Sequence, residues 1–227
     1  MIRLVSSICL FLRGLAMPQP LSRVAPNANV RIGNVGDYPL RRHPDLALLA
    51  AEVIASWSNV EAFTLRLFVD LMGGSQEIAT TVFLALEVQS QKSAAINAVA
   101  AEKLGQEQRA LLAAILACVK SNQKRRDKIG HWTWGDTPQI PDALLLINPK
   151  NAIDSDINRE QIFVYKNHDF DEIIKANERL AGFAMRFGFI VREAPQRDLL
   201  FAQLCAEPEI RERLDHLASQ AQSPDAK

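Results

Sequence analysis

Residues 44–74 read PDLALLAAEVIASWSNVEAFTLRLFVDLMGG, and this stretch decides the fold class. Its apolar residues recur at intervals of three, four or seven positions, the spacing that places them on one side of an α-helix. They are Leu46, Leu49, Val53, Trp57, Val60, Leu67 and Leu71. Pro44 favours the start of a helix and Gly73-Gly74 favours its end. The stretch therefore predicts one long amphipathic helix with a buried stripe.

Two further helical patterns follow this stretch. Ser75 is placed to cap a second helix over roughly residues 76–104, and the many alanines there indicate close approach between helices. Gly105 ends that pattern, and a third helix begins near Gln106. The apolar residues of the third helix again share one stripe: Leu112, Ile115 and Val119. Long helices joined by short loops are typical of a bundle rather than of βαβ units.

After His131 the period changes from helical to extended. Residues 143–147 (ALLLI) and 161–165 (QIFVY) are short runs of aliphatic, β-branched and aromatic residues. Turn-forming Asn, Pro and Asp residues lie between them. The two runs therefore predict an antiparallel ribbon with a long loop.

Two more helices complete the predicted fold. Asp169, with Glu172 three residues later, is typical of a helix start with a capping box, and Pro195 ends this fourth helix. A fifth, more polar helix covers about residues 196–218. We therefore predict an all-α fold, a helical bundle of about five helices with a small β-ribbon after the third helix.

The two ends of the chain lack helical or strand periodicity. Residues 1–42 hold clustered Pro and Arg and predict a disordered N-terminal arm, and residues 219–227 predict a flexible tail. Between them, residues 43–218 are predicted to form a single helical domain. Residues 1–16 imitate a secretory signal, but an arginine interrupts the apolar run early, and we favour Met17 as the true start over Met1.

The composition excludes several function classes. The 227 residues hold 26 Lys plus Arg and 26 Asp plus Glu, so the chain as a whole has no charge that would attract nucleic acid. No apolar run approaches the length of about 18 residues that a membrane span needs. The three cysteines share no metal-ligand spacing and cannot pair completely, which is typical of the cytoplasm. We find no phosphate-binding loop or metal-ligand motif, and we predict neither a cofactor nor a metal.

A compact basic segment lies within this balanced composition. Residues 120–131 carry five Lys or Arg side chains against the single Asp127, a net charge of +4. Such a cluster is either an anion-binding feature or a solvated helix end. In the first case Lys124, Arg125 and Lys128 attract phosphate, and Trp132 stacks on an unpaired base. The alternative for Trp132 is hydrophobic cover that leads into the ribbon.

Arg126 stands where the stripe of the third helix calls for an apolar residue. Helical steps from Ile115 and Val119 lead to this position. Because burying an unpaired guanidinium is costly, Arg126 needs a carboxylate partner or lines a cleft. Glu52 and Glu61 of the first helix are the candidate structural partners.

Asp127 and His131 are four residues apart and share one face of the predicted helix. A nearby carboxylate orients an imidazole and favours its charged form. Arg126 and His131 are separated by about 7.5 Å of helical rise and roughly 140° of rotation, which lets them flank a phosphate from two sides. Gly130 allows the helix to end or bend between them.

The run Arg126-Asp127-Lys128-Ile129-Gly130-His131 resembles the Arg, polar, three-residue, His motif of the HEPN superfamily, a group of helical domains. The likeness extends over about residues 44–191: two long helices, a third helix that carries the motif, and then a ribbon and another helix. The resemblance implies a homodimer in which two copies of the motif face each other. Arg126 and His131 are the implied functional residues, with Asp127 as the polar member. The sequence departs from the family pattern where Asp127 replaces a frequent Asn and where Trp132 follows the His.

Many HEPN proteins are metal-independent ribonucleases, so the resemblance implies an endoribonuclease of toxin–antitoxin or phage-defence type, with an antitoxin as partner. In such a reaction the ribose 2′-OH attacks the adjacent phosphate and leaves a 2′,3′-cyclic phosphate. His131 acts as general base or acid, and Arg126 stabilises the charge of the transition state. Two alternatives stay open. One is a catalytically silent HEPN-like dimeric module that binds RNA, a nucleotide or a protein partner. The other is a structural helical protein in which Arg126 only closes an internal salt bridge.

Overall fold

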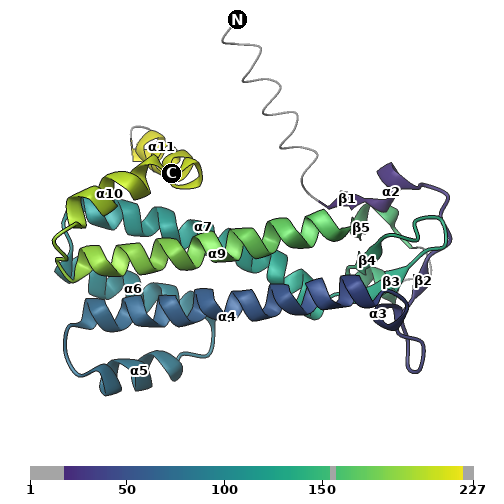
Figure 1. Ribbon diagram of the computed structural model, residues 1–227, viewed down its shortest axis with the longest axis horizontal. Coiled ribbons are helices and arrows are strands. Elements are labelled where there is room, and N and C mark those ends of the chain that lie inside the picture. The colour runs from purple at the N-terminus through teal and green to yellow at the C-terminus, as the bar shows by residue number, and fades with distance from the viewer. Residues whose placement is uncertain (1–17, 154–156, 222–227) are drawn as a thin grey trace, which may run out of the picture. The chain divides into compact units, whose positions relative to one another are not determined.

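The computed structural model describes residues 18–153 and 157–221, and this part of the chain is mostly helical (Figure 1). Its ten α-helices are α2 (Leu21–Val24), α3 (Pro39–Arg42), α4 (Pro44–Met72), α5 (Gln76–Leu84), α6 (Gln89–Lys103), α7 (Gln106–His131), α8 (Pro149–Ala152), α9 (Asn167–Val191), α10 (Arg197–Ala206) and α11 (Pro208–Ala221). Its strands are β1 (Gln19–Pro20), β2 (Arg31–Ile32), β3 (Thr133–Asp136), β4 (Leu144–Ile147) and β5 (Ile162–Tyr165), and a 3-10 helix covers Arg159–Gln161. The all-α class with a small antiparallel sheet is confirmed.

The contacts between Cα atoms divide the chain into two compact units, each built from two segments. The boundaries fall inside α4, α7 and α9, so each of these helices contributes residues to both units. The predicted helical region, residues 43–218, is thus distributed over both units. Of the described residues, the first unit holds 18–56, 124–153 and 157–176, and the second holds 57–123 and 177–221.

An antiparallel sheet lies in the first unit, with its strands in the order β1-β5-β4-β3-β2. The predicted ribbon is confirmed as β4 and β5, which pair from Leu144 opposite Tyr165 to Ile147 opposite Ile162. The sequence did not predict β3, which follows α7 almost directly and pairs with β4. All four residues of β4 are buried, as expected for a strand that is covered on both faces.

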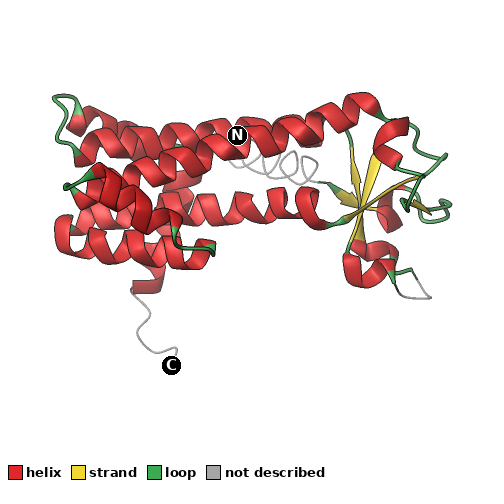
Figure 2. Ribbon diagram, turned by 90° about the horizontal axis from the view of Figure 1, so that it is seen from below, coloured by secondary structure: helices red, strands yellow, loops and turns green. Residues whose placement is uncertain are grey.

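Two apolar clusters cover the two faces of this sheet. On one face, side chains of β4 and β5 pack against the first turns of α4 and α9 and the last turns of α7. The buried helix residues of this cluster are Leu46, Ala50, Val53, Ile129, Phe170 and Ile173. On the other face, alternate side chains of the same strands pack against the segment before α4, where Leu21 and Ala28 are buried. Figure 2 shows these strands between helical segments.

Residues 18–42 form ordered structure, so the predicted disordered arm is wrong for this part of the chain. They supply β1 and β2, the two edge strands of the sheet. Gly135 allows the close approach of β2, because a Cβ there would lie 2.8 Å from the carbonyl oxygen of Arg31. Residues 1–17, with the choice between Met1 and Met17, lie outside the described residues. The same is true of 222–227 in the predicted tail 219–227, whose first residues belong to α11.

A buried carboxylate ties this segment to β3. Asp136 accepts hydrogen bonds from Nε of Arg31 at 2.7 Å and from Nε of Arg42 at 2.6 Å, and Nε2 of His43 lies 3.5 Å away. Arg42 also pairs with Asp37. Burial alone would raise the pKa of Asp136, but the hydrogen bonds from the two guanidinium groups outweigh burial and hold the pKa below its usual value.

One apolar core fills the second unit. Residues of α4, α5, α6, α7, α9, α10 and α11 contribute to it, and its largest fully buried side chains include Phe68, Phe183 and Phe187. A buried polar pair lies beside this core, where Asn122 donates to Asn177 at 2.5 Å. In the part of the chain that the structure describes, α4 is long and apolar enough to cross a membrane, a test that the core helix of a soluble protein also passes.

The predicted second helix over residues 76–104 is wrong as a single helix, because the chain forms α5 and α6 there. Within α5, Ile78 is 63% exposed although it is a large aliphatic residue. Ala79 and Phe83 are buried in its place. The ring of Phe83 packs on that of Phe68 at a centroid distance of 5.1 Å, so α5 presents this face to the core.

The predicted fifth helix over residues 196–218 is likewise two helices, α10 and α11. Pro208 occupies the first position of α11. Glu207 before it is extended, with φ −60° and ψ 128°, because a proline disfavours the helical conformation of the residue that precedes it. The polar residues on both sides of Pro208 continue a helix-like pattern, so the sequence did not indicate the break between α10 and α11.

The predicted fourth helix is confirmed as α9, although it begins two residues earlier than Asp169. The carboxylate of Asp169 accepts a hydrogen bond from the backbone N–H of Lys166 at 2.9 Å, so Asp169 fills the position that Glu has in a capping box. At the other end, Glu193 has a φ of 56°, the left-handed conformation that favours glycine. The N–H groups of Glu193 and Ala194 then bond to the carbonyls of Ile190 and Phe189, which closes the helix.

Candidate functional site

The predicted site residues lie in the first unit, on the last two turns of α7 and at the residue that follows. The predicted third helix is confirmed through His131. The backbone N–H of Trp132 still donates to the carbonyl of Lys128, at 2.9 Å. The helix therefore continues through Gly130 and ends at His131. These residues are held on a rigid element rather than on a loop.

Arg126 is half-buried, and its side chain is 27% exposed. Its Nη1 lies 3.3 Å from a carboxylate oxygen of Asp127, while its buried Nε has no hydrogen-bond partner among the described residues. The expected partners do not fill this role, since Glu61 accepts a hydrogen bond from Trp57 and Glu52 is exposed. A buried N–H donor without an acceptor is unfavourable, so the contact with Asp127 leaves Arg126 incompletely bonded.

Asp127 and His131 do not form the expected pair. The carboxylate of Asp127 is engaged by Arg126, the residue next to it. The imidazole of His131 is exposed, and it has no hydrogen bond or ion pair with any residue that the structure describes. The structure thus leaves His131 open to solvent and to ligands.

Lys128 and Trp132 are brought together, with a third residue that the sequence did not predict. The ammonium of Lys128 lies 4.8 Å from the ring centroid of Trp132 and 4.3 Å from that of Phe163. The two rings are 5.9 Å apart and tilted by 53°. Burial, followed by the charge of Arg125, lowers the pKa of Lys128. Lys128 is therefore held by aromatic rings and is not a freely extended phosphate ligand.

Phe163 reaches this group because of the register of the sheet. It alternates with the inward-facing Ile162 and Val164 on β5, and it lies opposite Leu146 of β4. The run QIFVY contains a signal that Phe163 and Tyr165 share one face. Nothing in the run indicates that this face meets the end of α7.

Lys124 and Arg125 complete the basic helix end. Lys124 is exposed, while Arg125 is partly buried. The charge of Arg125 acts on Lys128 and also on the hydroxyl of Tyr165, whose pKa is raised mainly by burial. The last two turns of α7 therefore present several cations around the incompletely bonded Arg126. Chemically, this arrangement can attract a polyanion and offer it one donor group, one imidazole and two aromatic rings.

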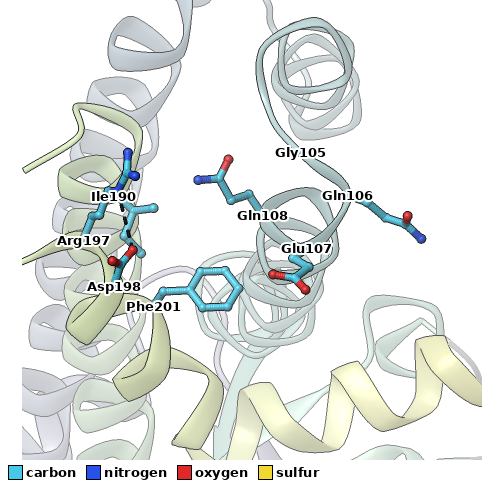
Figure 3. Close-up of a pocket in the computed structure, with 8 residues that line it drawn as sticks. All are labelled: Gly105, Gln106, Glu107, Gln108, Ile190, Arg197, Asp198 and Phe201. Carbon is cyan, nitrogen blue, oxygen red and sulfur yellow. Dashed lines mark ion pairs between the residues drawn. The ribbon is translucent and has the colours of Figure 1, made fainter.

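A separate cavity of about 630 Å³ lies in the second unit, and none of the predicted site residues line it (Figure 3). It is lined by Gly105, Gln106, Glu107, Gln108, Ile190, Arg197, Asp198 and Phe201. Arg197 lies 3.5 Å from Asp198 and 3.7 Å from Glu193, so the charge of this guanidinium is compensated within the chain.

Comparison of the chain with family models, with curated proteins and with solved structures gives no match. Across residues 18–153 and 157–221, no group of three or more His, Cys, Asp or Glu side chains is placed to hold a metal ion.

Proposed function

We propose that the protein is a HEPN-like, metal-independent endoribonuclease of toxin–antitoxin or phage-defence type. One observation carries the proposal: Arg126, with a buried Nε that lacks an acceptor, lies on the same helix end as the exposed His131. A guanidinium with an unmet donor is suited to the charge that develops on a phosphate. An exposed imidazole is suited to move a proton near neutral pH.

The proposed reaction is an internal transesterification of RNA. The ribose 2′-oxygen forms a bond to phosphorus and gives its proton to a histidine base. The bond from phosphorus to the 5′-oxygen then breaks, and that oxygen takes a proton as it leaves. Arg126 stabilises the extra negative charge of the five-coordinate phosphorus. Because one copy of the chain offers one such histidine, a homodimer with two facing motifs supplies both the base and the acid.

We also propose that the helices form a HEPN-like bundle. The order of α4, then α5 and α6, then the motif-bearing α7, then the ribbon and α9 supports a HEPN-like bundle. A homodimer places two copies of Arg126 and His131 near its axis. An antitoxin is the proposed protein partner. Light scattering at micromolar concentration tests the assembly, and a strictly monomeric mass contradicts the two-copy site.

A cleavage assay in EDTA tests the chemistry. The wild type is expected to cut RNA into products that end in 2′,3′-cyclic phosphate. His131→Ala is expected to lower the rate by about 100- to 10,000-fold, the usual contribution of a general acid or base. His168→Ala is the matched control, since His168 is an exposed histidine of the same unit with 59% of its side chain accessible. Unchanged cleavage by His131→Ala, or a requirement for Mg²⁺, contradicts the mechanism.

The second candidate function is a catalytically silent RNA-binding module. It is favoured by the pairing of Asp127 with Arg126, which leaves His131 without a carboxylate to orient it. In that case the wild type binds RNA but cuts none. Arg126→Lys then distinguishes the two functions further. The substitution keeps the charge for binding and removes the planar guanidinium that catalysis needs.

A further inference from the structure

The end of α7 carries an aromatic site that its own lysine occupies. The ammonium of Lys128 lies over both Trp132 and Phe163, at 4.8 and 4.3 Å from the ring centroids. All three side chains are half-buried, so each retains some exposed surface. Among the described residues, no carboxylate pairs with Lys128. Its contacts are therefore with the faces of two rings and not with a fixed opposite charge.

Contacts of this kind are weak and exchangeable. A cation over an exposed ring is stabilised modestly, and here burial and the charge of Arg125 act against the charged form. A nucleobase that stacks on an aromatic ring gains at least as much, and every base has such a face. A phosphate beside that base would offer the displaced ammonium the anion that it lacks.

We infer that Trp132 and Phe163 form a nucleobase-binding site that Lys128 occupies in the absence of ligand. When a single strand binds, a base stacks on these rings, and the ammonium of Lys128 moves from the rings to a phosphate of the strand. The ligand class is single-stranded RNA, because the base faces of a duplex are covered by their neighbours. This inference rests on the proposed function for the identity of the ligand. Binding of the strand and movement of Lys128 can be measured whether or not the protein cleaves RNA.

A binding experiment without cleavage tests the exchange. The probes are a dodecamer of deoxythymidine, which has no 2′-OH to attack, and a chain of equal length whose residues are abasic. Fluorescence anisotropy gives Kd for both. The wild type is expected to bind the dodecamer about tenfold more tightly than the abasic chain, which corresponds to one stacked base. Equal affinities for the two probes overturn the inference.

Variants identify the residues that make this difference. Trp132→Leu and Phe163→Leu are expected to bring the ratio of the two affinities close to one. Lys128→Met is expected to increase the ratio, because the rings are then free for the base. It should also lower the slope of log affinity against log salt by about 0.7, the value for one phosphate contact on a single strand. Thermal unfolding followed by circular dichroism verifies that each variant is folded.

Lys124→Met is the matched control, because Lys124 is an exposed lysine one turn earlier on α7. It should lower the salt slope by the same amount and leave the ratio unchanged. If Lys128→Met behaves in the same way as Lys124→Met, Lys128 is an ordinary phosphate ligand and the inference fails. Absence of RNA cleavage with the ratio intact removes the proposed ribonuclease and leaves the base site. Cleavage of RNA together with an affinity ratio of one removes the base site and leaves the proposed ribonuclease.

Discussion

The two units differ in what they bury. The second unit encloses an aliphatic and aromatic core, and its buried polar side chains Thr64 and Asn122 are hydrogen bonded, at 2.7 and 2.5 Å. The second unit also holds the carboxylate of Asp70, which is 4% exposed and pairs with Arg66 at 3.1 Å. The first unit differs because one of its buried charged groups lacks a partner. It holds the carboxylate of Asp136, which is fully buried, and the Nε of Arg126, which has no acceptor.

This difference separates packing from function along a single helix. The first part of α7 contributes Leu112, Ile115 and Val119 to the core of the second unit. The last part of α7 carries Arg126 and His131 in the first unit. A charged group that is neither fully solvated nor fully bonded is a typical component of a binding or catalytic site. The comparison therefore predicts which substitutions act on stability and which act on ligands.

The largest expected effect is in the second unit. Phe187 is fully buried, and Phe187→Ala should lower the free energy of unfolding by about 4 kcal/mol through the cavity that it leaves. Phe189→Ala on the same helix should cost about 1 kcal/mol, because Phe189 is 38% exposed. Urea unfolding measures both. Equal losses would contradict the assignment of Phe187 to the core.

The buried carboxylate of the first unit gives the next effect. Asp136→Asn should lower the free energy of unfolding by about 3 kcal/mol, because two guanidinium groups lose their counter-charge. Asp142→Asn is the control and should change stability by less than about 0.5 kcal/mol, since the Asp142 side chain is 65% exposed. Hydrogen exchange should show the loss in the β-sheet. A loss spread equally over α10 and α11 would mean that the two units do not unfold separately.

Acidification tests the same carboxylate with a smaller effect. Because the pKa of Asp136 is lower in the folded chain than in the unfolded chain, its stabilisation is complete above about pH 4. It is lost as the pH falls through the folded value. The difference in unfolding free energy between the wild type and Asp136→Asn should therefore shrink below pH 4. Asp169, whose pKa is raised by burial, acts in the opposite direction and is common to both proteins. A constant difference from pH 7 to pH 3 would exclude this linkage.

The smallest expected effect is a gain. Glu193 has a φ of 56°, which costs a residue with a Cβ more than it costs glycine. Glu193→Gly should raise the free energy of unfolding by about 0.5 kcal/mol. Glu193→Ala keeps the unfavourable conformation and should bring no gain. A rise in Tm of a degree or more for the glycine variant alone would support this account of the end of α9.

The sequence predicted the long helices well because their apolar period extends over many turns. The stripes of α4, α7 and α9 each contain enough residues to specify a face, and the QIFVY run was enough to specify β5. The breaks were missed for local reasons. Pro208 lies in a polar stretch that continues to look helical, and residues 76–104 contain no glycine or proline that would mark the end of α5.

The edge strands β1 and β2 could not be predicted from the sequence. Each has only two residues, which is too short to show an alternating apolar pattern, and their partner strands lie far away in the sequence. Arg31 contacts Asp136 across 105 residues. In the candidate site, sequence spacing correctly grouped Lys124 to Trp132 on one helix end. It failed for contacts that depend on tertiary packing. Phe163 comes from another strand, and Asp127 pairs with Arg126 where spacing favoured His131.

The sheet has a consequence for how the protein is made. Its edge strands belong to a segment that is synthesised before their partners, which follow 105 residues later for Arg31 and 131 residues later for the contact of Ala28 with Arg159. At 5–20 residues per second, this segment waits roughly 5 to 25 s before it can pair. During that interval a nascent chain carries Leu21 and Ile32 exposed, together with four arginines that keep it hydrated: Arg23, Arg31, Arg41 and Arg42. Two of these four, Arg31 and Arg42, become the partners of Asp136 once β3 has been synthesised.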